Sequence, residues 1–145
     1  MWPRTSIKGR WRRFAAYDIP VLLYAGLIFW LSSQSYTPRE KQWLDLMPDL
    51  VLHGIEYGIL ALLLLRQLYG SGRMRNLFGA ALLSLFISVA YGFSDEWHQS
   101  FVPQREMDLR DGIANAVGAA LFLGGALGYL LRKKELTPLN HHDSL

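Results

Sequence analysis

The sequence contains no cysteine among its 145 residues. A disulfide framework, a catalytic thiol and thiolate-bound zinc or iron–sulfur sites are therefore excluded. Charge is also scarce, because Lys, Arg, Asp and Glu make up only 19% of the chain. The net charge of +3 comes from short cation clusters at the ends of apolar blocks, which is typical of membrane topology. We therefore expect no nucleic-acid partner.

Apolar sequence is abundant and falls into four blocks, at 19–31, 50–65, 77–93 and 113–131. Each block approaches the length of about 20 residues that a helix needs to span a bilayer. We predict an all-α integral membrane protein built as one bundle of four transmembrane helices. A basic flank at 1–17 precedes helices at about 18–34, 50–69, 77–94 and 111–131, and a flexible tail at 135–145 follows them.

The first apolar block has two interpretations. A basic segment, an apolar run and the triplet Ser33-x-Ser35 together fit a cleavable signal peptide. Asp18 and Pro20 favour a retained transmembrane helix instead, because Asp is a common N-cap and Pro is common in the first helical turn. We expect the retained helix, with its start at Asp18.

One stretch, at 90–125, carries many charged and polar residues between two apolar segments. Ionisable residues at the edge of membrane-buried segments need partners or a watery cavity, so a functional site is expected here. Helical spacing predicts polar stripes on the second, third and fourth helices, and we expect them to converge at the outer ends. Cysteines introduced at Ile55 and Val117, on the opposite faces, should not crosslink. The candidate residues of this polar, carboxylate-rich site are His53, Glu56, Tyr57, Tyr91, Asp95, Glu96, His98, Gln99, Arg105, Asp111 and Asn115.

Asp95 and Glu96 repel each other, and the helix dipole disfavours both at the end of the third helix. Arg105 or Arg110, a divalent cation or a bound proton could offset this repulsion. Asp95, Glu96 and Asp111 are the candidate metal ligands, and a divalent cation is the only cofactor considered. Structural alternatives stay open, because acids at 108 and 111 can cap a helix and small residues such as Gly118 pack helices closely.

The sequence YGFSDEWHQ at 91–99, then FVP-x-R at 101–105, then Asp111, Asn115 and Gly118, resembles the signature of the VanZ-like family of small bacterial membrane proteins. His53 and Tyr57 are similar to the family's His-x-x-x-Tyr element, and FWLSSQ at 29–34 is similar to the end of its first helix. Leu50 stands where the family often carries Lys. The resemblance implies the bacterial cytoplasmic membrane, the cell envelope and a link to resistance against glycopeptide antibiotics, teicoplanin in particular.

Several functions are compatible with these residues. The favoured one is binding of a lipid-linked or envelope headgroup, with Arg105 as the phosphate contact. A membrane-embedded acid–base or metal-dependent enzyme acting on a lipid is the alternative, although no nucleophile motif accompanies the acids. A small proton-coupled transporter or a structural accessory subunit also stays open, although nothing polar is expected in the inner halves of the helices. The expected partners are membrane lipids, a lipid-linked envelope precursor and a second copy packed through small residues of the fourth helix.

Basic residues predict the orientation. Eleven of the fifteen Lys and Arg lie before residue 14, at 66–76 or at 132–134. Excess Lys and Arg mark the cytoplasmic side, so both termini should be cytoplasmic. A phosphatase or fluorescent reporter fused after Leu131 should therefore report a cytoplasmic position, and an external signal there would contradict the orientation.

Overall fold

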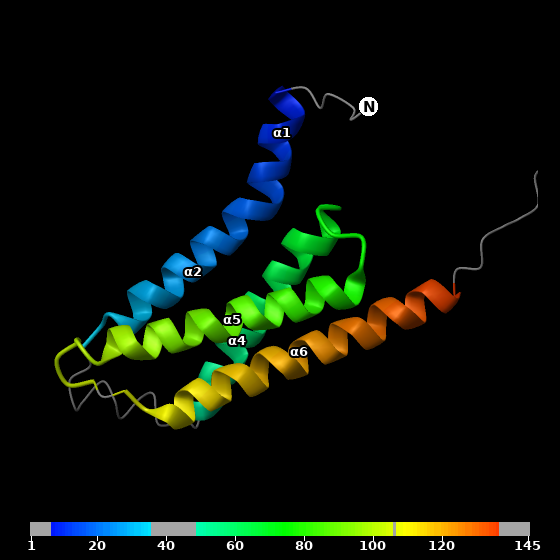
Figure 1. Cartoon of the computed structure of the whole chain (residues 1–145). Helices are drawn as coiled ribbons and strands as arrows, with labels where there is room; N and C mark the ends of the chain where they lie inside the picture. The colour runs from blue at the N-terminus through cyan, green and yellow to red at the C-terminus, as the bar shows by residue number, and fades with distance from the viewer. Residues whose placement is uncertain (1–6, 36–48, 106, 137–145) are drawn as a thin grey trace, which may run out of the picture.

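The computed structural model describes residues 7–35, 49–105 and 107–136, and every regular element in these ranges is a helix (Figure 1). Four continuous helical segments of the described chain are long and apolar enough to span a membrane. The predicted all-α bundle of four membrane helices is therefore confirmed. The predicted flexible tail lies, from residue 137 onward, outside the described residues. The elements are α1 (Ile7–Arg13), η1 (Phe14–Asp18), α2 (Ile19–Ser32), α4 (Asp49–Leu65), η2 (Arg66–Gly70), α5 (Leu77–Gln99) and α6 (Leu109–Leu136).

The first membrane helix does not start at Asp18 as predicted. Helical structure runs from Ile7 to Ser32 through a π-helical turn at Phe14–Asp18, and Asp18 makes no capping hydrogen bond. The π turn precedes Pro20, which has no N–H to donate to the carbonyl one turn earlier. Arg66 Nη1 donates to that carbonyl, on Ala16, at 2.7 Å instead.

Asp18 is the partner of an arginine rather than a helix cap. The Arg73 guanidinium donates from Nη1 and Nη2 to the two Asp18 carboxylate oxygens, at 2.8 Å each. Gln67 Nε2 donates to Asp18 Oδ1 at 2.7 Å, and Asp18 is only 8% exposed. This bidentate pair joins the start of α2 to the chain after η2. From the sequence, nothing polar is expected in the inner halves of the helices. The pair of the buried Asp18 with Arg73 lies there, so this expectation is wrong.

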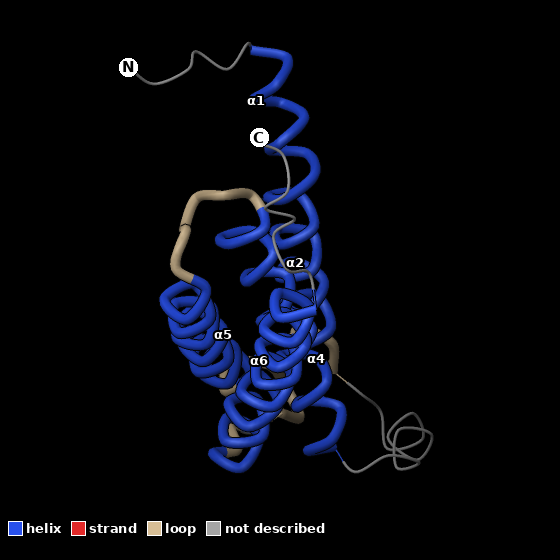
Figure 2. The backbone as a smooth tube through the Cα atoms, turned by 90° about the vertical axis from the view of Figure 1, so that its right-hand side faces the viewer, coloured by secondary structure: helices blue, strands red, loops and turns tan. Residues whose placement is uncertain are grey.

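The helix α4 has the other three membrane helices as neighbours, and its contact with α6 is the most extensive (Figure 2). Its apolar residues enter two buried clusters, one shared with α5 and α6 and one shared with α2. The first contains Ala61, Leu65, Ala80, Ala81, Ala119 and Leu123; the second contains Val21, Ile28, Tyr57, Leu60 and Leu64. Many of the first set are small, so the helix backbones come close.

The closest approach lies between Gly54 of α4 and Gly118 of α6. A Cβ atom added to Gly118 would lie 1.9 Å from the Gly54 carbonyl oxygen, so only glycine fits. Gly124 and Gly128, further along α6, have open space around them. Gly118 therefore packs within the chain, and self-association through the rest of α6 stays a prediction.

The helices alternate in direction, so four helix ends meet at one end of the bundle (Figure 1). We call this the polar end: α2 ends there at Ser32, α4 begins at Asp49, α5 ends at Gln99 and α6 begins at Leu109. The third membrane helix, α5, was predicted to end at residue 94 but continues to Gln99. Asp95, Glu96, His98 and Gln99 therefore lie on the helix rather than in a loop.

The Gly54–Gly118 contact predicts a sharp difference between two Gly→Ala substitutions on α6. Gly118→Ala should lower the thermal unfolding temperature of the detergent-solubilised protein, because overpacking costs about 1–3 kcal/mol. Gly124→Ala is the matched control and should not destabilise, since nothing lies within 4 Å of its added Cβ. Equal melting temperatures for the two variants would contradict the helix crossing described here.

Candidate functional site

The Asp95 carboxylate is buried between α2 and α5, with 4% of the residue exposed. Ser32 Oγ donates to Asp95 Oδ1 at 2.6 Å, and Gln99 Nε2 donates to Asp95 Oδ2 at 3.1 Å. A buried charge is strongly unfavourable without such partners. Both oxygens are thus engaged within the protein, so Asp95, a predicted metal candidate, links α2 to α5.

Arg105 extends this network from the segment that follows α5. Its Nη1 donates to Gln99 Oε1 at 3.1 Å, and its Nε donates to the Gln34 carbonyl at 3.3 Å. Arg105 therefore reaches Asp95 through Gln99 rather than directly. Arg105, which the sequence analysis proposed as a phosphate contact, thus uses two of its donors for hydrogen bonds within the protein.

Other side chains of α5 also face α2. His98 Nε2 lies 3.0 Å from Ser33 Oγ, and the His98 ring stacks on Phe29 with ring centroids 4.5 Å apart. The Tyr91 hydroxyl donates to the Ala25 carbonyl at 2.7 Å. These contacts dock the second half of α2 along α5. The polar stripe predicted on the third helix thus faces α2 in part.

A second cluster joins the remaining three helices, and we call it the triad: His53 from α4, Glu96 from α5 and Asp111 from α6. One possible metal-ligating atom from each residue lies within 4.8 Å of the other two. His53 Nε2 is 3.6 Å from Asp111 Oδ2, and the Asp108 backbone N–H donates to Glu96 Oε2 at 3.3 Å. His53 and Glu96 are 8% and 2% exposed. Asp111 is partly exposed, so the triad is a largely buried group of one imidazole and two carboxyls with one carboxyl toward its edge.

Buried polar atoms beside the triad have no hydrogen-bond partner in the described protein. They are His53 Nδ1, the Tyr57 hydroxyl oxygen, Glu96 Oε1 and both side-chain amide atoms of Asn115. Asn115 is 1% exposed, one turn along α6 from Asp111, and its Nδ2 lies 3.1 Å from a Cβ added to Gly92. A buried polar group left without a partner costs about 1–3 kcal/mol. These atoms are therefore the natural contacts of water or a ligand.

Two predicted site residues of α4 lie beside the triad rather than in it. Tyr57 is fully buried one turn from His53, with its ring centroid 6.3 Å from that of Tyr91. Glu56 is half-buried, three residues along α4 from His53. Both therefore lie within about one turn of His53 on α4.

The two acids at the start of α6, Asp108 and Asp111, have different roles. Asp108 Oδ1 accepts the Arg110 backbone N–H at 2.8 Å, which caps the helix as the sequence analysis allowed. Asp111 lies in the first turn, where the helix dipole favours a negative charge, and it points to His53. Capping is thus the role of Asp108, and Asp111 belongs to the triad.

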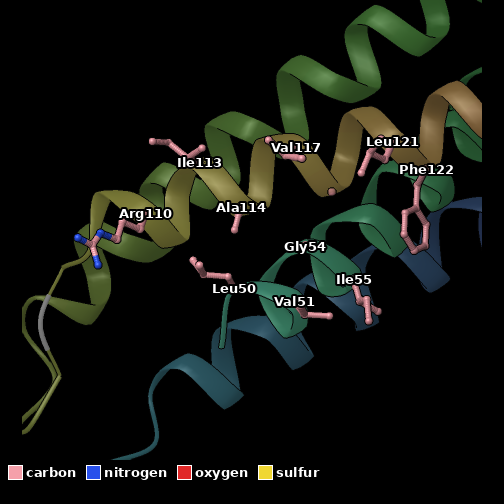
Figure 3. Close-up of a pocket in the computed structure, with 11 residues that line it drawn as sticks. Leu50, Val51, Gly54, Ile55, Arg110, Ile113, Ala114, Val117, Leu121 and Phe122 are labelled. Carbon is pink, nitrogen blue, oxygen red and sulfur yellow. The ribbon is translucent and has the colours of Figure 1, made fainter. Parts of the chain in front are cut away.

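An apolar groove of about 520 Å³ lies between α4 and α6 (Figure 3). Ile55 and Val117 both line it, so the two residues border one groove, and the absence of a crosslink between cysteines at these positions stays a prediction. The close helix crossing places side chains of both helices along one groove. Its lining is apolar except for Arg110, which is exposed at the polar end. The lining residues are Leu50, Val51, Gly54, Ile55, Arg110, Ile113, Ala114, Val117, Gly118, Leu121 and Phe122.

Sequence reasoning did not propose Ser32 or Ser33 as site residues. Their signal was present, because two hydroxyls end an otherwise apolar helix within the FWLSSQ segment. Their partners, Asp95 and His98, lie more than sixty residues away. Arg110, considered only as a counter-ion, is the cation at the end of the groove.

A family model described as VanZ/LLP1 matches residues 19–132. The match runs from the start of α2 almost to the end of α6, so it covers the Asp95 network, the triad and the groove. No curated protein and no solved structure matches the chain.

The bond from Ser32 to Asp95 predicts that Ser32→Ala destabilises the protein. The substitution removes one of the two partners of a buried carboxylate, which costs about 1–3 kcal/mol or more. Ser94→Ala is the matched control, because the exposed Ser94 hydroxyl bonds only to the Tyr91 carbonyl of its own helix. Thermal unfolding in detergent should show the larger loss for Ser32→Ala. The same melting temperature for both variants would contradict the assigned role of Ser32.

Proposed function

We propose that this chain, which belongs to the VanZ-like family and is a multi-pass membrane protein, binds the anionic headgroup of an envelope lipid at its polar end. The observation that carries the proposal is the apolar groove between α4 and α6, which ends at the exposed Arg110, the residue before Asp111 of the triad. An amphiphile needs this combination of an apolar channel and a polar terminus. The proposed membrane is the bacterial cytoplasmic membrane, with both protein termini in the cytoplasm.

The groove suits a hydrocarbon chain. Its volume of about 520 Å³ falls within the range of roughly 300–1,000 Å³ typical of ligand pockets. A hydrocarbon chain lying in the groove between Ile55 and Val117 would contact both helices instead of bulk lipid. The groove follows the helices, so the bound lipid would be held parallel to them with its headgroup at the polar end.

The headgroup would meet Arg110 first. A guanidinium binds phosphate through two parallel hydrogen bonds, and Arg110 is exposed for such a contact. Arg105, the contact expected from the sequence, serves in this proposal by holding Gln99 and the end of α2.

This position also gives a physical route to the link with glycopeptide resistance that family membership suggests. In the proposed orientation the polar end faces outward, toward the cell envelope. A protein that holds a lipid-linked envelope precursor there would change how much of that lipid the drug meets. We therefore propose that teicoplanin resistance, where this chain confers it, depends on the groove and the polar end.

Catalysis on the bound lipid is the second candidate function, and the triad is the observation that favours it. An imidazole next to two carboxyls could act as general acid and base on a headgroup bond. The two functions differ in outcome, because an enzyme returns an altered lipid and a binding protein returns the lipid intact.

The test is lipid binding by the purified full-length protein, measured by native mass spectrometry with phosphatidylglycerol, a polyprenyl phosphate and neutral phosphatidylcholine. The wild type should retain both anionic lipids over the neutral one. Arg110→Gln should weaken anionic binding by at least about tenfold, because a hydrogen bond to a charged group contributes about 1.5–3 kcal/mol. Val117→Trp should block all three lipids by filling the groove.

Matched controls exist for both substitutions. Arg132→Gln removes an exposed cation at the other end of α6, and Leu82→Trp enlarges an exposed apolar residue of α5 outside the groove. Both controls should bind as the wild type does. Equal loss in controls and groove variants, or no preference for anionic lipid, would contradict the proposal. In a susceptible bacterium, only the controls should preserve any increase in the teicoplanin inhibitory concentration.

A further inference from the structure

We propose that His53, Glu96 and Asp111 bind one divalent transition-metal ion of the Zn²⁺ type. The inference rests on the site of the proposed function and deepens it by naming the ion that would face the headgroup. It replaces the metal set expected from the sequence, since His53 takes the place of Asp95.

The geometry of the triad is close to that of a metal site. Zinc lies about 2.0–2.2 Å from imidazole nitrogen and carboxylate oxygen, which places ligand atoms roughly 3–4 Å apart. His53 Nε2 and Asp111 Oδ2 are 3.6 Å apart, and all three ligand atoms lie within 4.8 Å of one another. Small side-chain rotations would therefore complete the site. The ligands come from three different helices, so one ion would tie α4, α5 and α6 together.

The unpartnered atoms point independently to a missing ligand. Glu96 Oε1 is buried and accepts no hydrogen bond, although the other oxygen of this carboxyl is bound by the Asp108 N–H. Asn115, one turn deeper, offers two more unpartnered atoms at 1% exposure. Asp95 accepts hydrogen bonds from Ser32 and Gln99 on its two oxygens and does not belong to the group of close ligand atoms. An ion at the triad, with its bound water toward Asn115, would satisfy these atoms.

The donor set determines the class of metal. One imidazole and two carboxylates suit zinc, manganese or ferrous iron, whereas magnesium and calcium prefer oxygen ligands alone. Three protein ligands leave at least one coordination position open to water or to an outside oxygen.

Charge gives the ion a role in the proposed function. Without a cation, two carboxylates would repel a phosphate. A divalent ion with a neutral His53 brings the triad to a formal charge of zero and presents a Lewis-acidic centre to a phosphate oxygen. The acidic end of the bundle could then receive an anionic headgroup beside Arg110.

The test uses metal alone. Full-length protein is purified without a polyhistidine tag, stripped with a chelator and exchanged into metal-free buffer. Zinc binding is then measured by competition with a chromophoric chelator and by elemental analysis. The wild type should bind one Zn²⁺ per chain. Glu96→Gln and Asp111→Asn should each weaken binding by at least ~10-fold, the loss that even supporting residues of metal sites typically produce.

Asp108→Asn is the matched control. It also removes one negative charge at the start of α6, but Asn still caps the helix and the backbone N–H to Glu96 remains. Its zinc affinity should equal that of the wild type. A double variant, His141→Gln with His142→Gln, removes the histidine pair near the C-terminus and should also retain full binding.

Three outcomes would overturn the inference. They are a wild-type protein without saturable zinc binding, Glu96→Gln and Asp111→Asn variants that bind as tightly as Asp108→Asn, and loss of zinc in the His141/His142 variant. The first needs no variant, so it decides the question even if the triad variants fold poorly. Zinc should also raise the melting temperature of the wild type, because a ligand bound only to the folded state stabilises it. No lipid enters these assays, so their failure would leave lipid binding through Arg110 and the groove to be judged separately.

Discussion

A carboxylate buried between apolar helices is stable only when other groups satisfy its charge, and Asp95 is where this requirement organises the polar end. Ser32 donates a hydrogen bond to one of its oxygens and Gln99 to the other. Arg105 then donates to both Gln99 and the Gln34 carbonyl just after α2, which links the two. The result is that the ends of α2 and α5 and the segment after α5 are fixed around one acid. The triad beside it depends on that arrangement, because Glu96 follows Asp95 on the same turn of α5.

In addition to the two buried apolar clusters, two different kinds of contact hold the bundle together. The pair α4 and α6 touches backbone to backbone at Gly54 and Gly118, which needs no polar group and leaves a groove outside the crossing. The helix α2 is held by polar contacts near its two ends, to Arg73 through Asp18 and to Asp95 through Ser32. The tight pair supplies two triad residues and the groove, and α2 closes the other side of the polar end.

Much of this could be predicted from the sequence, because the signals are local. Block length was enough to predict four membrane helices, and the spacing of His53, Asp111 and Asn115 was enough to predict polar stripes on the second and fourth helices. Adjacent residues such as Asp95 and Glu96 point about 100° apart on a helix, so they face different neighbours. Spacing cannot say which neighbour is α2. The same limit explains why the partner of Asp18 and the groove shared by Ile55 and Val117 were not predicted, since both depend on how the helices cross.

The docking of α2 on α5 is the central claim, and disulfide formation in native membranes tests it most directly. The chain has no cysteine, so a pair introduced by Ser32→Cys and Asp95→Cys can be followed without background. Ser32 Oγ and Asp95 Oδ1 are 2.6 Å apart, and this pair should join readily on mild oxidation or with a short crosslinker. A pair introduced by Trp30→Cys and Asp95→Cys should not join, because Trp30 is 58% exposed on the outer side of α2. Efficient joining of the Trp30 pair together with failure of the Ser32 pair would contradict the polar end as described.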